Sequence, residues 1–156
     1  MSRVILATII GMICSFGVQA QNKTDKKPEL VWLTDVTKAQ EVSNKTKKPI
    51  FAFFTGSDWC GWCHKLQRDV FAKPEFVSWA KKNVVLLELD FPRMKKNQLP
   101  AEQTKQNESL AAKYNKEGIF PLVVLTDEDG KVIATTGYKS GGPESYIEHL
   151  KELQQK

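Results

Sequence analysis

The sequence has few residues that could hold a metal ion or form many disulfides: three cysteines and two histidines among 156 residues. An exported protein that relies on disulfides for stability usually carries several, spread along the chain. A structural zinc site needs four converging ligands, and Cys60, Cys63, His64 and His149 make an implausible set. We therefore expect neither a disulfide-stabilised scaffold nor a metal site, and no cofactor.

The N-terminal apolar run, 4–18, falls short of the length of a membrane-spanning helix, which needs about 20 residues. The run follows a short basic start at Arg3. Val18 and Ala20 then place small residues at positions −3 and −1 of a cleavage site. These features predict a secretory signal peptide over 1–20; the alternative is an uncleaved membrane anchor. We expect a protein that is periplasmic or otherwise exported.

The rest of the chain is long enough for one domain with a core of its own. We assign a polar, flexible leader to 21–29 and the domain to 30–156. The formal net charge is +5, but the lysines are scattered among glutamates and no aromatic residues interleave with them. This pattern favours a solvated surface over a nucleic-acid or anionic-lipid patch. With no large apolar patch evident, we expect a monomer.

Two cysteines stay in the mature chain, because Cys14 leaves with the signal peptide. Cys60 and Cys63 stand two residues apart, and a disulfide that closes so short a loop adds almost no stability. The pair is therefore expected to serve chemistry rather than folding.

The cysteine pair follows a short apolar run, 50–55, in which five of six residues are β-branched or aromatic, as suits a buried strand. Ser57 or Asp58 can cap the helix that comes next. Cys60 then lies in the first helical turn, where free backbone N–H groups favour a negative charge and a thiol ionises more easily than at its free pKa of about 8.5. Cys63, one turn on, is close enough to form a disulfide with Cys60.

The remaining pattern alternates strands and helices. Apolar and β-branched runs predict strands at 30–33, 84–89, 122–125 and 131–136, the last two joined by a hairpin turn at 127–130. Helical spacing predicts helices that start at 34 or 35, after the cysteine strand, at 74, near 102 and at 141–143. The polar stretch from Phe91 to Asn107 is expected to be a surface insertion. This order predicts an α/β domain with a central mixed β-sheet flanked by helices on both faces.

These residues resemble the thioredoxin superfamily over about 30–154. The features are Trp59-Cys60-Gly61-Trp62-Cys63 after a buried strand, Phe120-Pro121 before the next strand, the hairpin and the final helix. Within the superfamily the chain is most similar to exported members, such as the periplasmic C-terminal domain of the transmembrane disulfide-interchange reductase. The resemblance implies a thioredoxin-like fold and a thiol–disulfide oxidoreductase.

The resemblance also implies roles for single residues. Cys60 would be the exposed nucleophile that attacks a substrate disulfide, and the more buried Cys63 would resolve the mixed disulfide. Pro121 would follow a cis peptide bond and face the cysteines. The implied partners are proteins with disulfides and a membrane protein that supplies electrons. The substrate groove would comprise Trp59, Gly61, Trp62, Phe120 and Pro121, with core packing as an alternative role for Trp59.

One departure from cytosolic thioredoxin concerns proton transfer at Cys63. The buried aspartate and lysine that assist it there correspond here to apolar strand positions, Phe53 or Phe54 and Leu86 or Leu87. Asp58, Glu88 or solvent must then accept the proton. Asp58 and His64 are also candidates for tuning the pKa of the cysteines.

Two other functions fit the motif. Cys60-x-x-Cys63-His64 matches the pattern of c-type haem attachment, with Met94 as the remaining candidate for a second ligand. A non-catalytic thioredoxin-like binding module is the other, although it would not need both cysteines. Histidine between the cysteines is associated with strongly oxidising relatives. His64 lies outside the pair, so we expect a reductant or an isomerase.

Overall fold

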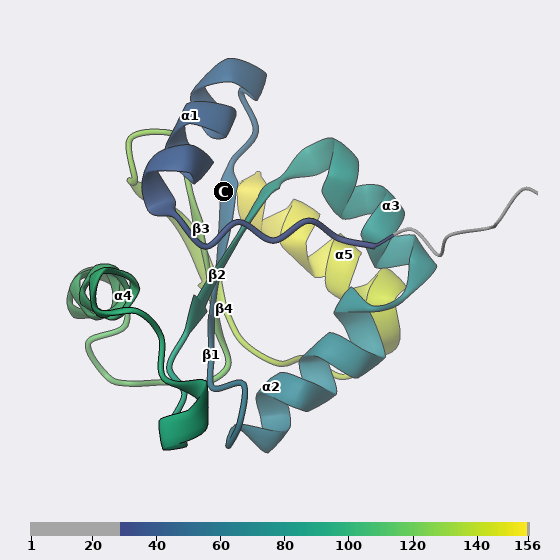
Figure 1. Ribbon diagram of the computed structural model, residues 1–156. Coiled ribbons are helices and arrows are strands. Elements are labelled where there is room, and N and C mark those ends of the chain that lie inside the picture. Colours follow the sequence, from purple (N-terminus) through teal and green to yellow (C-terminus); the bar gives the residue numbers. More distant parts are fainter. Residues whose placement is uncertain (1–28, 156) are drawn as a thin grey trace, which may run out of the picture.

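A computed structural model describes residues 29–155 (Figure 1), so the predicted signal peptide over 1–20 and almost all of the leader lie outside the described residues. The elements in chain order are α1 (Val36–Thr46), β1 (Ile50–Thr55), α2 (Gly61–Leu66), the π-helical segment η1 (Gln67–Phe71), α3 (Pro74–Asn83), β2 (Val85–Asp90), the 3₁₀ turn η2 (Lys95–Asn97), α4 (Ala101–Tyr114), β3 (Leu122–Thr126), β4 (Val132–Thr136) and α5 (Gly142–Gln154). The predicted α/β class and the mixed sheet are confirmed.

The sheet has the strand order β2-β1-β3-β4. Strand β1 runs parallel to β2 and antiparallel to β3, and β4 pairs antiparallel with β3. All six residues of β1 are buried, because neighbours pair with it on both edges and helices cover both of its faces. The strand that delivers the cysteines is therefore the centre of the domain.

The predicted strand at 30–33 is wrong except at its last residue. Leu33 forms an isolated parallel bridge with Leu87, in which the Leu33 N–H donates to the carbonyl oxygen of Leu86 at 2.9 Å. The chain then turns into α1, since the Asp35 carboxylate caps that helix by accepting the N–H groups of Thr37 and Lys38. This cap ends the pairing before a strand can extend.

Helices cover the two faces of the sheet unequally (Figure 1): α2, α3 and α5 lie on one side, and α1 and α4 on the other. We call the first side the cysteine face, because Cys60 and Cys63 belong to the core cluster there together with Phe51, Phe53 and Leu86. The opposite face carries the alternate residues of the same strands, among them Phe54 and Leu87. This alternation follows from the two-residue period of a β-strand.

Aromatic rings fill the cysteine face. Phe71 of η1 lies at the centre of this cluster, and its ring centroid is within 4.8–6.1 Å of five other rings. These rings belong to Trp32, Phe51, Phe53, Phe76 and Tyr146. The helix that carries the cysteines is thus packed against the sheet by large apolar side chains.

Candidate active site

Cys60 and Cys63 lie where the chain passes from β1 into α2, and they are joined by a disulfide. Both are buried in this oxidised form: Cys60 is 5% exposed and Cys63 is fully buried. The expected exposure of Cys60 is therefore wrong for the oxidised form, in which both sulfurs belong to the buried core cluster of the cysteine face.

The residue that caps α2 is Cys60 itself, so the predicted cap at Ser57 or Asp58 is wrong. The Cys63 N–H donates to Cys60 Sγ at 3.2 Å. Ser57 is engaged elsewhere, because its N–H and hydroxyl both donate to the Asp90 carboxylate, at 2.8 and 2.6 Å. A thiolate at Cys60 would therefore have a backbone N–H and the start of a helix beside it, which stabilises negative charge.

Asp58 anchors the segment that follows β2. Its carboxylate accepts the backbone N–H groups of Arg93 and Met94, at 3.0 and 2.9 Å, and the side-chain amide of Asn97 at 2.9 Å. These hydrogen bonds, that from Arg93 first, lower the pKa of Asp58. Within residues 29–155 the carboxylate forms no hydrogen bond to a cysteine sulfur. The prediction that Asp58 tunes the pKa of the cysteines is therefore not supported by a direct contact.

His64 is exposed and turns back toward the residues before the helix. Its Nε2 lies 2.8 Å from the carbonyl oxygen of Ser57. The haem alternative would need this nitrogen as an iron ligand. In this structure the nitrogen instead contacts the loop that precedes α2. Met94, the second ligand in that alternative, lies in the segment that Asp58 holds.

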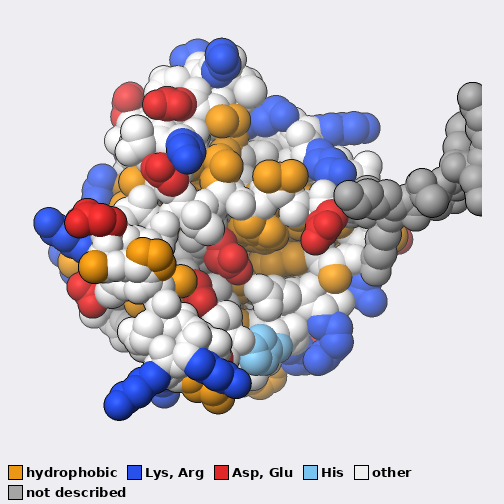
Figure 2. Space-filling view, viewed as in Figure 1, with side chains coloured by type: hydrophobic (Ala, Val, Ile, Leu, Met, Phe, Trp, Pro, Cys, Tyr) orange, Lys and Arg blue, Asp and Glu red, His pale blue; other side chains and the backbone are white. Residues whose placement is uncertain are grey.

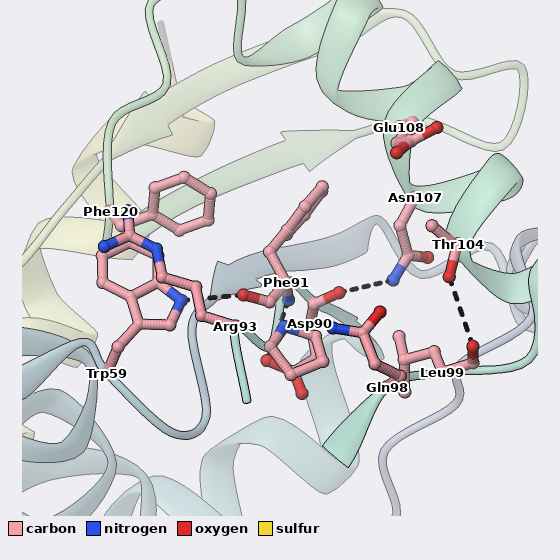
Figure 3. Close-up of a pocket in the computed structure, with 11 residues that line it drawn as sticks. Trp59, Asp90, Phe91, Arg93, Gln98, Leu99, Thr104, Asn107, Glu108 and Phe120 are labelled. Atoms are coloured by element: carbon pink, nitrogen blue, oxygen red, sulfur yellow. Dashed lines mark hydrogen bonds between the residues drawn. The ribbon is translucent and has the colours of Figure 1, made fainter. Parts of the chain in front are cut away.

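The Phe120–Pro121 peptide bond is cis, as the resemblance implies. Phe120 packs its ring 5.2 Å from that of Trp59. The Trp59 indole N–H in turn donates to the carbonyl oxygen of Phe91 at 2.7 Å (Figure 3). Trp59 is therefore half-buried packing beside the cysteines, consistent with the alternative role we considered for it.

Gly56 permits this packing, and the sequence alone did not single it out. A Cβ at position 56 would clash with the Trp59 indole. The loop between β1 and α2 thus needs glycine at this position, because any side chain would displace the tryptophan. The sequence does show a glycine three residues before the tryptophan, but it does not show that the indole ring folds back onto this glycine.

The other flank of the cysteine pair is open to solvent. Gly61 is exposed, and Trp62 is 59% exposed. The ring centroids of Trp62 and Tyr138 lie 5.1 Å apart. The Lys65 Nζ lies 5.5 Å from the Tyr138 ring centroid and also forms an ion pair with Asp69. Tyr138 was not among the predicted site residues; its place after the β4 hairpin brings it to the cysteines only in the folded chain.

The four apolar residues at the positions expected for the proton-transfer pair divide between the two faces of the sheet. Phe53 and Leu86 lie on the cysteine face, whereas Phe54 and Leu87 lie on the opposite one. Glu88, two residues after Leu86, is half-buried on the cysteine face by the same alternation. Burial, and after it the charge of Asp90, raises the pKa of Glu88.

No cluster of three or more His, Cys, Asp and Glu side chains is arranged to hold a metal ion in the part of the chain that the structure describes. Among those same residues, no helix is both long enough and apolar enough to cross a membrane.

Comparison with known proteins gives a consistent family. The thioredoxin-like domain family matches residues 36–154. The chain is 42% identical over 113 residues to the disulfide bond reductase DsbH of Chlamydia pneumoniae, which covers 72% of this chain and 66% of the relative. It is 25% identical over 139 residues to the thioredoxin-related protein DsbJ of the same organism, covering 88% of this chain and 39% of the relative. The chain thus spans less than two thirds of either relative.

Among solved structures, the fold is similar to that of a DsbH oxidoreductase, with a TM-score of 0.75, 38% identity, and coverage of 81% of this chain and 85% of that one. It is also similar to the oxidised C-terminal domain of DsbD from Neisseria meningitidis, with a TM-score of 0.53, 17% identity, and coverage of 78% and 98%. The second likeness concerns the fold alone.

Proposed function

The chain belongs to the thioredoxin-like domain family, and from this premise we propose that it is an exported thiol–disulfide oxidoreductase that reduces or isomerises disulfides of other proteins. The observation that carries the proposal is the Cys60–Cys63 disulfide at the start of α2, with the Cys63 N–H directed at Cys60 Sγ. The name of the 42% identical relative, a disulfide bond reductase, supports the direction.

The proposed reaction starts from the reduced pair. The Cys60 thiolate attacks one sulfur of a client disulfide, so that a mixed disulfide forms and the other client sulfur leaves as a thiolate. The Cys63 thiolate then attacks Cys60 Sγ and releases the second client thiol. The client gains two electrons, and the protein is left with the Cys60–Cys63 disulfide.

Cys63 must lose its thiol proton before it attacks, and Glu88 is the acceptor that we propose. It is a half-buried carboxyl on the cysteine face, and its raised pKa brings it nearer to the range of a thiol. Asp58 suits this role less, because three donors already hold its carboxylate and lower its pKa.

Turnover as a reductant requires a donor that returns two electrons to the Cys60–Cys63 disulfide. We propose a membrane protein for this task, since an exported reductant works in an oxidising compartment. The exported location itself rests on the predicted signal peptide over 1–20. We propose that the protein is a monomer and that the donor and the client bind in turn to the same exposed surface at Gly61 and Trp62.

The direct test is dithiothreitol-coupled reduction of insulin by the mature chain. We expect Cys60→Ser to lower the rate to the uncatalysed background, because the attacking sulfur is gone, and Cys63→Ser to accumulate a mixed disulfide with the client. Ser109→Ala, at an exposed position of α4, is the matched control and should keep the wild-type rate.

The reduction potential of the pair, measured against glutathione, tests the direction. We expect a value nearer to about −270 mV than to about −120 mV, the two ends of the range for this class of protein. A fully reduced mature chain that opens no protein disulfide, together with a Cys63→Ser variant that traps no client, would overturn the proposal.

A further inference from the structure

A cavity of about 340 Å³ lies beside the cysteine pair, between the start of α2, the segment after β2 and α4 (Figure 3). Trp59, Phe91 and Phe120 form its wall near the cysteines, and Thr104 and Glu108 of α4 lie at its far end. Trp59 precedes Cys60 and Phe120 precedes Pro121 in the chain, so two residues of this wall are direct chain neighbours of redox-site residues.

Arg93 is the cation of this cavity, and its charge is uncompensated. Its guanidinium carbon lies 3.7 Å from the centroid of the Trp59 ring, and the side chain is exposed. Within residues 29–155, its guanidinium forms no ion pair and donates no hydrogen bond. A planar group with five N–H donors thus lies over the ring of the tryptophan next to Cys60, with its donors available.

The backbone fixes where this guanidinium stands. The Arg93 N–H donates to the Asp58 carboxylate at 3.0 Å, and the N–H of Met94 donates to the other oxygen of the same group. Asp58 lies two residues before Cys60, so one hydrogen-bonded unit ties the position of Arg93 to that of the cysteine. A donor fork with a fixed backbone loses less entropy on binding than a free surface side chain does.

The acidic groups near this end of the cavity are already engaged. Asp58 accepts three hydrogen bonds, and the Asp90 carboxylate accepts from Ser57 and from the Phe91 N–H at 2.9 Å. Glu108 is exposed and lies at the opposite end of the cavity. Lys95 and Lys96 of η2 are also exposed; Figure 2 shows Lys and Arg side chains at the edge of the molecule where η2 lies, as at its other edges.

We propose that this cavity receives the side chain of an acidic residue from the client segment next to the target disulfide, and that Arg93 is the residue that selects it. This inference rests on the proposed function. The Trp59 and Phe120 rings would contact the aliphatic part of a glutamate, and the guanidinium would bind its carboxylate through two parallel N–H···O hydrogen bonds. Clients with an acid beside the disulfide would then be reduced faster than neutral ones.

The test uses three short peptides that carry the same disulfide and differ at one neighbouring position: glutamate, glutamine or lysine. The reduced mature protein is mixed with each peptide, and the second-order rate constant is measured. We expect the glutamate peptide to react about three- to fivefold faster than the glutamine peptide, as fits a partly exposed charge pair. In 0.5 M salt this ratio should fall toward one, because salt screens the pair.

Variants at position 93 should change the ratio rather than merely the rate. We expect Arg93→Gln to bring the ratio of the glutamate to the glutamine rate constant to about one. In Arg93→Glu the glutamate peptide should react more slowly than the glutamine peptide, and the lysine peptide should react fastest. Arg93→Lys keeps the charge without the planar fork and should give an intermediate value. Lys95→Gln and Lys96→Gln are the matched controls, since each removes one charge from the same segment, and both should keep the wild-type ratio.

A wild-type ratio of one, or a ratio that survives in Arg93→Gln, would overturn the inference. Equal losses in the Lys95→Gln and Lys96→Gln controls would also overturn it, because the effect would then be the general charge of the segment. Failure of the underlying function would look different: none of the peptides would be reduced by any variant, the neutral peptide included.

Discussion

The two faces of the sheet are covered in physically different ways. On the cysteine face, large apolar side chains from α2, η1, α3 and α5 interlock with those of the strands. On the opposite face, α1 buries Ala39 and Ser43 and α4 buries only Asn107. The first face depends on buried apolar area, which is non-directional, and the second depends to a greater degree on individual hydrogen bonds.

The hydrogen bonds of α4 show what the second arrangement provides. The Asn107 side-chain amide donates to the carbonyl oxygen of Asp90 at 2.9 Å. The amides of Gln103 and Gln106 donate to the carbonyl oxygen of Thr34, at 2.7 and 2.9 Å. Directional bonds of this kind fix the position of α4 and of the segment that precedes it, and Arg93 lies in that segment. The cysteine face holds the sulfurs, and the hydrogen bonds of α4 over the opposite face place the residues beside them.

Removing a ring from the cysteine face should have the largest effect on stability. We expect Phe71→Ala to lower the free energy of unfolding by about 3–5 kcal/mol, because the buried ring leaves a cavity among five other rings. Urea denaturation followed by circular dichroism measures it. Leu110→Ala, at a half-buried position over the opposite face, is the control and should cost clearly less. Equal losses for the two variants would contradict the contrast between the faces.

A single hydrogen-bonding side chain should matter most on the opposite face. We expect Asn107→Ala to lower the free energy of unfolding by about 1–3 kcal/mol, since the buried Asn107 side chain and its partly buried hydrogen bond to the carbonyl oxygen of Asp90 are then lost. The same urea titration measures this loss. Ser109→Ala, two residues on and exposed, should leave the midpoint unchanged. A neutral Asn107→Ala would mean that α4 is held by its apolar contacts instead.

The smallest of these effects should come from Asp58, and it should depend on pH. Hydrogen bonds lower the pKa of this carboxyl in the folded chain below its ordinary value of 3.8. Its stabilising contribution is therefore complete above the ordinary value and is lost as the pH falls through the lowered one. We expect Asp58→Asn to lower the melting temperature at pH 7 by less than Asn107→Ala does.

The difference between wild type and Asp58→Asn should then shrink as the pH falls below about 3.8, the ordinary pKa of the group. Melting temperatures measured between pH 7 and pH 2.5 check this. Asp129→Asn, in the exposed hairpin turn, is the control for loss of a surface carboxylate. A difference that stays constant over this range would show that the charge of Asp58 plays no part in holding the segment.

Local pattern predicted much of this fold. The helix expected near 102–114 is α4 (Ala101–Tyr114), and the buried run at 50–55 is β1. Where prediction failed, a neighbour distant in sequence or an alternative local bond decided the outcome. Leu33 stops pairing because the chain enters α1. Ser57 does not cap α2 because the helix begins only at Gly61, where Cys60 is the cap, while Asp90, 33 residues on, holds Ser57 in the preceding loop.

The site divides in the same way. The position of the cysteine pair after a buried strand and at the start of a helix is a local property, and the sequence alone determined it. The stacking of Arg93 on Trp59, the anchoring of 93–97 by Asp58 and the approach of Tyr138 to Trp62 were decided by the tertiary structure. Exposed polar residues leave no periodic signal, because their partners are chosen by the way the loops meet and not by the residues next to them.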